Sequence, residues 1–227
     1  MKAMILAAGR GERLRPLTDR IPKALLVAGG KPLLAWHLER LARAGFREVV
    51  INVSHLGASI VDRFGDGAVH GLAIRWSHET EALETAGGIA QARALLGADP
   101  FILLNADVWC DLDLASLRAH RLGTHLAHLV LAANPPHHSN GDFSLRGASV
   151  GNDSSPRYTY TGIAVLLPAL VDGIRPGEKA PLAPMLRAAA ARGAVSGEIH
   201  AGVWRDVGTA ERLAELESLL QGKRIAT

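Results

Sequence analysis

The chain has 227 residues, of which 48% are hydrophobic and 21% are charged, and its formal net charge is +3. This length and composition suit one globular domain with a sizeable core. The small net charge excludes a nucleic-acid binder unless the positive residues cluster. Cys110 is the one cysteine, which excludes an intramolecular disulfide, and no apolar run of about 18 residues indicates a membrane span. We therefore expect a soluble, cytoplasmic protein with no nucleic-acid and no membrane partner.

Strands and helices are expected to alternate over the first part of the chain. The predicted order is strand 1–8, a glycine-rich loop, helix 32–45, strand 48–53, helix 57–67, strand 72–77, helix 86–97, strand 100–107 and strand 125–133. Such alternation predicts right-handed βαβ units on a mostly parallel sheet. The strands lack polar alternation, which indicates that helices cover both faces. The predicted fold class is α/β, with a single-domain, Rossmann-like sheet sandwiched by helices.

The sequence changes character after residue 133. Residues 134–168 are rich in Gly, Pro, Ser and Asn, which predicts a small antiparallel excursion with turns. A helix over 180–193, two short strands within 194–208 and a C-terminal helix over 209–227 complete the chain. Thr209 is the expected N-cap of that last helix, and Asp113 is the expected N-cap of a helix from Leu114. Asp111 is expected to be solvated.

The loop after the first strand, AAGRGERLRPLTDRIPKAL, concentrates positive charge. Within residues 7–25 it holds five cations, which are Arg10, Arg13, Arg15, Arg20 and Lys23. Glycine-rich loops after parallel strands wrap phosphates, because their backbone N–H groups converge. The loop lacks the third glycine of the dinucleotide fingerprint and the Gly-Lys-Ser/Thr of the P-loop. A phosphate site of another kind is predicted, with a solvated basic loop as the alternative.

The same loop carries a family signature. Ala8-Gly9-x-Gly11-x-Arg13-Leu14-x-Pro16-Leu17-Thr18, followed by Pro22-Lys23, resembles the motif of sugar-1-phosphate nucleotidylyltransferases. Glu12 stands where the family has Thr, and Ala24 stands where it has a second Pro. The resemblance implies a GT-A-like nucleotidyltransferase fold. It also implies that the backbone from Ala8 through Gly9, Gly11 and Glu12 to Arg13 holds the β- and γ-phosphates of a nucleoside triphosphate.

Two side chains of the motif acquire catalytic roles from the resemblance. Arg13 would bind the departing pyrophosphate, and Lys23 would bridge the α-phosphate and the attacking sugar phosphate. These roles fit the chemistry of the side chains, since arginine makes bidentate contacts with phosphate oxygens and lysine adds a mobile point charge.

Two distant carboxylates are the expected ligands of a magnesium ion. Mg²⁺ prefers one or two carboxylates together with phosphate oxygens and waters. Asp107 ends the strongest predicted strand, and ligand crevices of open α/β sheets lie at the carboxyl ends of strands. Trp204-Arg205-Asp206-Val207-Gly208-Thr209 resembles the family's W-x-D-x-G-T, which supplies the second ligand. A helix-capping role is the alternative for Asp206, although Thr209 is better placed for it.

The resemblance also implies the two substrate pockets. The remaining nucleotide-binding residues would be Asn52, Thr85, Gly87, Gly88 and Asn105. Gly87 and Gly88 would lie under the base and ribose, with a simple helix start as the alternative. The expected sugar-binding residues are Glu84, Asp142, Asn152, Thr161, Gly162 and Lys179, of which Lys179 would approach the sugar phosphate unless it is a solvated loop lysine. Residues 1–133 would then bind mainly the nucleotide, and residues 134–208 mainly the sugar.

Further matches narrow the substrate. Leu83-Glu84-Thr85-x-Gly87-Gly88 resembles the family branch that acts on N-acetylmuramate 1-phosphate and on mannose- or heptose-type phosphates. Asn52-x-x-His55-Leu56-Gly57 and Asn134-Pro135-x-His137-His138 favour the muramate type. The resemblance therefore implies transfer of a uridylyl group from UTP to N-acetylmuramic acid 1-phosphate in peptidoglycan recycling, by an enzyme that is more readily a monomer than a trimer. His137 and His138 are interpreted as loop residues without a role.

Three alternatives stay open at this point. The first is guanylyl transfer to mannose 1-phosphate or heptose 1-phosphate, and the second is cytidylyl transfer to phosphocholine. The third is a non-catalytic nucleotide-sugar sensor that keeps the fold.

Overall fold

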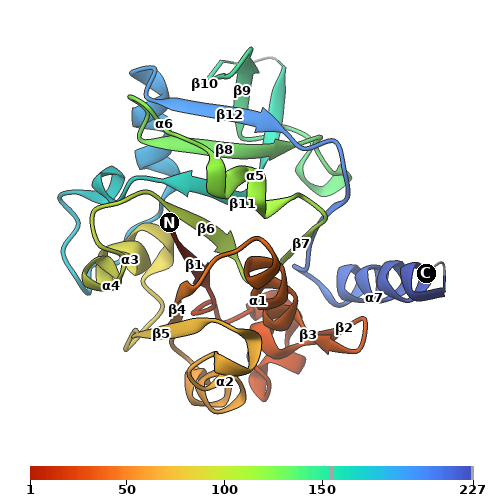
Figure 1. Ribbon diagram of the computed structural model, residues 1–227. Coiled ribbons are helices and arrows are strands. Elements are labelled where there is room, and N and C mark those ends of the chain that lie inside the picture. Colours follow the sequence, from red (N-terminus) through yellow and green to blue (C-terminus); the bar gives the residue numbers. More distant parts are fainter. Residues whose placement is uncertain (154–155, 226–227) are drawn as a thin grey trace.

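The computed structural model describes residues 1–153 and 156–225, and within them a mixed sheet forms the centre of the molecule (Figure 1). Its nine strands lie in the order β5-β4-β1-β6-β11-β8-β12-β10-β9. Their bounds are β1 Lys2–Leu6, β4 Glu48–Val53, β5 Ala73–His78, β6 Phe101–Asn105, β8 Ala127–Ala132, β9 Phe143–Arg146, β10 Ser149–Gly151, β11 Arg157–Leu166 and β12 Val195–Ile199. Residues 154 and 155 of the predicted excursion lie outside the described residues.

The first half of the sheet is parallel, as predicted, and the second half is more antiparallel than predicted. Strands β5, β4, β1 and β6 run parallel to one another. Strand β11 then lies antiparallel between β6 and β8, and β12 pairs parallel with β8. The reason is that β11 leaves the β9–β10 excursion at the far edge and crosses back into the middle of the sheet. The α/β class is confirmed.

Helices cover both faces of the sheet. The covering helices are α1 Leu33–Arg43, α2 Gly57–Phe64, α3 Glu84–Gln91, α4 Arg93–Leu96, α5 Leu114–Ala119 and α6 Ala183–Ala191, and a further helix, α7 Ala210–Ile225, lies beside the sheet. Alternate residues of β1 point to opposite layers: Ala3 and Ile5 pack in the cluster under α1 and α2, and Met4 packs under α3, α4 and α6. Burial on both faces explains why the strands lack a polar side.

Several predicted helix ends are confirmed. The Thr209 hydroxyl accepts a hydrogen bond from the Arg212 N–H at 3.4 Å, and the Asp113 carboxylate accepts one from the Ala115 N–H at 2.9 Å. Gly45, with φ of 82°, follows the end of α1, where only glycine adopts a left-handed conformation without strain. The predicted helix 86–97 instead begins at Glu84 and is interrupted at Ala92.

Helix α7 packs against the two-stranded sheet of β2 (Val27–Ala28) and β3 (Lys31–Pro32), to one side of the main sheet (Figure 1). Leu216 and Leu220 of the helix are buried in a third cluster with Leu26 and Trp109. This anchor fixes the segment that leads into the helix. Residues 226 and 227 of the predicted C-terminal helix lie outside the described residues, and among the described residues no helix is long and apolar enough to cross a membrane.

Two buried histidines are expected to make the folded state less stable at acidic pH. Burial lowers the pKa of His37 from 6.5 to about 4, with Arg40 adding to the shift, and burial together with His120 lowers that of His128 to about 4. Because these pKa values are depressed in the folded state, the unfolded chain takes up protons first as the pH falls below 6.5. Each histidine should therefore cost about 2 kcal/mol of stability between pH 7 and pH 5.

Urea unfolding at several pH values measures this effect. His37→Leu removes one of the two groups, so its free energy of unfolding should fall less steeply below pH 6.5 than that of the parent chain. If the free energy of unfolding fell equally steeply with pH in the two proteins, His37 would not be held neutral in the folded state.

Candidate active site

The glycine-rich loop after β1 is stabilised by its own contacts. It folds into three short 3₁₀ turns, Glu12–Leu14, Leu17–Asp19 and Lys23–Leu25. Gly11 has φ of 65°, and the Thr18 hydroxyl donates a hydrogen bond to its carbonyl oxygen at 2.9 Å. A Cβ on Gly11 would lie 2.9 Å from the Thr18 methyl carbon, whereas a Cβ on Gly9 would meet nothing within 4 Å. Gly11 thus serves the fold of the loop, and Gly9 leaves open space above it.

The five cations of this loop do not all face one another. Arg15 pairs with Asp19 at 3.0 Å within the loop, and Lys23 pairs with Asp107 from a different part of the chain. The side chain of Lys23 is only 14% exposed, so its charge is held in place rather than solvated. A polar contact of this kind, close to a glycine-rich turn, positions a cation for an anionic ligand.

The two predicted metal ligands lie at the ends of paired segments of the chain. Asp107 stands between β6 and β7 (Val108–Cys110), and Asp206 ends β13 (Trp204–Asp206). Strands β7 and β13 pair antiparallel, with Asp206 opposite Val108, and the Val207 N–H donates to the Asp107 carbonyl oxygen at 2.8 Å. Asp107 and Asp206 are 99 residues apart in the sequence, yet the strand pairing brings their backbones together.

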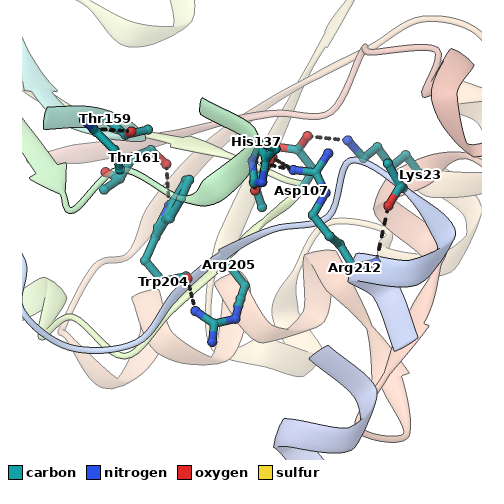
Figure 2. Close-up of polar contacts among 11 residues, drawn as sticks. Lys23, Asp107, His137, Thr159, Thr161, Trp204, Arg205 and Arg212 are labelled. Carbon is teal, nitrogen blue, oxygen red and sulfur yellow. Dashed lines mark hydrogen bonds and ion pairs between the residues drawn. The ribbon is translucent and has the colours of Figure 1, made fainter. Parts of the chain in front are cut away.

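Each of these carboxylates contacts a positively charged or imidazole side chain (Figure 2). Lys23 contacts Asp107, and Arg212 contacts Asp206. His137 Nε2 lies 3.3 Å from Asp206 Oδ1 and 2.8 Å from an Arg212 nitrogen. Neither acid is a helix cap, because Thr209 caps α7. The carboxylates are one-quarter to one-third exposed, which leaves oxygen atoms accessible from the pockets beside them.

Arg13 extends toward the same region. A Cβ on Gly208 would lie 3.1 Å from Arg13 Nη2, so the guanidinium lies against the turn between β13 and α7. Lys23, Asp107, Asp206 and Arg13 are therefore gathered at one end of the sheet, although Asp206 lines a different pocket from Lys23 and Asp107. Their predicted roles in catalysis and metal binding stay predictions.

A pocket opens between the glycine-rich loop and the carboxyl ends of the parallel strands. We call it the glycine-loop pocket. The predicted residues that line it are Ala8, Gly9, Gly11, Lys23, Asn52, Glu84, Thr85, Asn105 and Asp107. Glu12 instead lines a separate surface pocket with Arg10, His55 and Lys179. The position of the main pocket follows the rule that ligands bind outside the carboxyl ends of strands.

Gly87 and Gly88 are not among the residues that line the glycine-loop pocket, and their place under a base stays a prediction. Both are buried inside α3. A Cβ on Gly87 would overlap the Glu178 carbonyl oxygen, and a Cβ on Gly88 would lie 2.8 Å from both Asn52 Nδ2 and Glu79 Oε1. The missing side chains make room for other parts of the protein. The alternative interpretation, a helix-start role, is the one that the packing favours.

Glu79 is a pocket residue that the sequence analysis missed. It is 6% exposed, and its carboxylate accepts hydrogen bonds from Asn52 Nδ2 at 2.7 Å and from the Leu83 N–H at 2.9 Å. Asn52 in turn accepts from the Ala7 N–H at 2.8 Å, so the pair ties three segments together. Burial raises the pKa of Glu79, and the two hydrogen bonds oppose that shift. Its position directly after β5, like that of Asp107 after β6, was the available signal.

A second pocket shares Glu84, Thr85 and Asn105 with the first, and we call it the adjoining pocket. Its other lining residues include Asp142 and Arg187 together with an apolar group made of Phe143, Pro181, Leu182, Ala183 and Leu186. Glu84 has φ of 60°, an uncommon conformation for a residue with a side chain, at the junction of the two pockets. Glu84 and Asp142 are the predicted sugar-binding residues that this pocket brings together.

Four other predicted sugar-binding residues lie elsewhere. Thr161 is 1% exposed, and its hydroxyl donates a hydrogen bond to the Val130 carbonyl oxygen at 2.7 Å. Its side chain is therefore buried within the sheet and does not reach the adjoining pocket. Gly162, with φ of 78°, accommodates the Asn105 side chain, which lies 2.5 Å from where its Cβ would be. Asn152 donates to the Arg187 carbonyl oxygen at 2.9 Å. Lys179 lies 3.9 Å from Glu84 but lines the separate pocket of Arg10 and Glu12.

Asp111 and His137 have partners that the sequence did not reveal. Asp111 is exposed, as expected, and it also accepts from the Val203 N–H and contacts His200 Nε2, both at 2.8 Å. His137 was expected to have no role, but it contacts Asp206, while His138 contacts Asp142 at 3.0 Å. The two histidines therefore face different acids. Trp204 donates its indole N–H to the Thr161 carbonyl oxygen at 2.9 Å and so braces β13 (Figure 2).

The donor set fits a hard divalent cation. Asp107 and Asp206 offer carboxylate oxygens from paired segments of the chain, next to a loop of backbone N–H groups, and Mg²⁺ takes such oxygens with phosphate oxygens and water. The nearby cations Lys23 and Arg212 would share those carboxylates with it. The two aspartates and the glycine-rich loop can together hold a phosphate ligand with a bound cation.

Comparison with known proteins identifies the class. Residues 2–142 match the family model described as nucleotidyl transferase, and the chain belongs to that family. A Neisseria meningitidis serogroup B protein named N-acetylmuramate alpha-1-phosphate uridylyltransferase is 50% identical over 231 residues, with 96% of this chain and 98% of that protein covered. A Synechocystis protein named UTP–glucose-1-phosphate uridylyltransferase is 32% identical over 206 residues, with 79% and 52% covered.

Other matches support the fold or part of the chain. A Xenopus tropicalis protein named mannose-1-phosphate guanylyltransferase catalytic subunit beta is 44% identical over 114 residues, which are 49% of this chain and 32% of that protein. A crystal structure from Bacillus anthracis, in complex with sucrose and provisionally described as a glucose-1-phosphate thymidylyltransferase, superposes with a TM-score of 0.87. The superposition covers 97% of this chain and 95% of the other, at 19% sequence identity, and this similarity supports the fold alone.

Gly88, packed inside α3, and Gly9, on the wall of the glycine-loop pocket, give a testable contrast. Gly88→Ala should destabilise the protein by about 1 to 3 kcal/mol, because the new methyl group would overlap the Asn52–Glu79 pair. Gly9→Ala, whose Cβ meets open space, should leave stability unchanged or raise it by up to about 1 kcal/mol. Urea unfolding of the two variants measures both effects. Equal stabilities would show that the pair does not depend on Gly88.

Proposed function

We propose that the chain transfers a uridylyl group from UTP to N-acetylmuramic acid 1-phosphate and releases pyrophosphate. The observation that carries the proposal is that Lys23 and Asp107 line the glycine-loop pocket together, while the pairing of β7 with β13 brings Asp206, which lines a different pocket with His137 and Arg212, next to them. The substrate pair comes from the Neisseria relative, which matches nearly its whole length. A product of this kind would serve peptidoglycan recycling in the cytoplasm, where UTP is made.

The two pockets divide the substrates between them. The triphosphate would lie in the glycine-loop pocket, with its phosphates over Gly9 and near Arg13 and Lys23. The sugar would lie in the adjoining pocket, which shares Glu84, Thr85 and Asn105 with the first. The shared wall would bring the sugar phosphate next to the α-phosphate. Residues 1–133 would thus bind mainly the nucleotide, and residues 134–208 mainly the sugar.

The reaction needs no covalent intermediate, because the attacking group is already an anion. An oxygen of the sugar phosphate forms a bond to the α-phosphorus, and the bond from that phosphorus to the bridging oxygen breaks as pyrophosphate leaves. Lys23 would hold the two phosphates against their mutual repulsion, and Arg13 would accept the charge that develops on pyrophosphate. Positioning of this kind contributes about 7 to 11 kcal/mol in favourable cases.

Asp107 and Asp206 would hold a Mg²⁺ ion. When bound there, the ion supplies positive charge to the phosphate oxygens and reduces the repulsion between the two anionic substrates. The Lys23–Asp107 contact keeps the lysine and the carboxylate in register, so that one faces the phosphate and the other the metal. Arg212 and His137 orient the Asp206 carboxylate in the same way.

Substitution of the gathered residues tests these roles. Asp107→Ala, Asp206→Ala and Lys23→Ala should each lower turnover by at least about 10²- to 10³-fold, by analogy with the loss of one charge-stabilising donor. Asp62→Ala is the matched control, because Asp62 is exposed on α2, away from both pockets. Pyrophosphate release, with circular dichroism to verify folding, provides the measurement. A variant that kept near-full activity would remove that residue from the site.

A substrate panel tests the proposed function itself. Four nucleoside triphosphates are each combined with the 1-phosphates of N-acetylmuramic acid, N-acetylglucosamine, glucose, mannose and heptose, and with phosphocholine. UTP with N-acetylmuramic acid 1-phosphate should give the highest kcat/KM, and a chelator should abolish turnover until Mg²⁺ is restored. A preference for GTP with mannose or heptose 1-phosphate, or for CTP with phosphocholine, would replace the proposal. Triphosphate binding without turnover of any pair would favour a sensor.

A further inference from the structure

The adjoining pocket has a cation on its wall that the proposed chemistry does not use. Arg187, on α6, is the one positively charged side chain among the described residues that line it. Building on the proposed function, we propose that Arg187 binds a carboxylate carried by the sugar itself. N-acetylmuramic acid is N-acetylglucosamine with a lactyl ether at C3, and that lactyl group supplies such a carboxylate. Arg187 would therefore select the muramic acid substrate over N-acetylglucosamine 1-phosphate.

The guanidinium of Arg187 is positioned without being neutralised. One terminal nitrogen donates to the Asp142 carbonyl oxygen at 3.2 Å, and the group lies over the Phe143 ring at 5.1 Å. The residue is exposed and makes no ion pair with any of the described residues. Since an arginine has five N–H donors, most of them are free to bind a carboxylate, and the planar fork matches one in a bidentate manner.

The acids of the pocket do not compete for this cation. Asp142 is the nearer one, but its carboxylate oxygens are engaged by His138 at 3.0 Å and by the Tyr160 N–H at 2.8 Å. Glu84 lies 3.9 Å from Lys179, which offsets its charge at the junction of the pockets. An anionic group that enters beside α6 therefore meets Arg187 as its partner.

The rest of the wall also suits a lactyl ether on an N-acetyl sugar. The apolar residues of the pocket, Phe143, Pro181, Leu182, Ala183 and Leu186, offer contacts for the lactyl and acetyl methyl groups. Tyr160 belongs to the same wall, and its buried hydroxyl has no hydrogen-bond partner. Burial and the nearby Asp142 raise the pKa of this hydroxyl, so it stays protonated and able to donate.

The matched pair of sugars separates this role from a phosphate contact. The 1-phosphates of N-acetylmuramic acid and N-acetylglucosamine share the phosphate and the acetamido group and differ by the lactyl ether. Arg187→Gln should raise KM for the first about 10- to 100-fold, the range expected for a lost charged hydrogen bond, with kcat little changed. With the second sugar, kcat/KM should change by less than about 3-fold. Arg187→Lys should restore part of the loss.

Arg192→Gln is the matched control, because Arg192 is an exposed arginine at the end of the same helix, outside the pocket. It should behave as the parent chain with both sugars. Equal losses for Arg187→Gln on both sugars, or no loss on either, would overturn the assignment of Arg187. If the parent chain used other substrates and neither of these two sugar phosphates, the proposed function itself would be wrong, whatever the role of Arg187. If the parent chain preferred N-acetylglucosamine 1-phosphate to the muramic acid compound, the proposed selection by Arg187 would be wrong. The proposal of uridylyl transfer would not be affected.

Discussion

The antiparallel pairing of β7 with β13 is the constraint on which the site depends. It ties the segment just after the central strand β6 to the segment that enters the C-terminal helix, and so brings Asp206, at the end of β13, next to Asp107, in the turn before β7. The Thr209 cap, the buried Leu216 and the Trp204 indole hydrogen bond hold β13 in place from three sides. Without this pairing, the two acids would belong to unrelated parts of the surface.

Charge balance explains why so many cations can be concentrated in one region. Lys23 and Arg212 each contact one of the two acids, and Arg15 is balanced within its own loop. Like charges that would repel one another are thereby spaced around two carboxylates. The proposed substrates would bring further phosphates to this place, and Asp107 and Asp206 would hold a metal ion whose positive charge offsets theirs.

The sequence predicted what is local or carried by a motif. Asp107 was found because an apolar strand ends there, and Thr209 was found because a helix begins there. The antiparallel place of β11 was not predicted, since it depends on where the excursion returns in space. Glu79 and His137 were missed for the same reason: each acquires its partner, Asn52 or Asp206, from a distant segment. Gly87 and Gly88 were assigned to a ligand, although the atoms that need their space belong to Glu178, Asn52 and Glu79.

The central claim is that Asp107 and Asp206 hold one metal ion together on the polyphosphate of the substrate. The most direct measurement is anomalous diffraction from a crystal of the protein with UTP and Mn²⁺ in place of Mg²⁺. One ion should lie about 2.1 Å from a carboxylate oxygen of each aspartate, and should also contact a phosphate oxygen. An ion bound by only one of the two acids, or by neither, would contradict the claim.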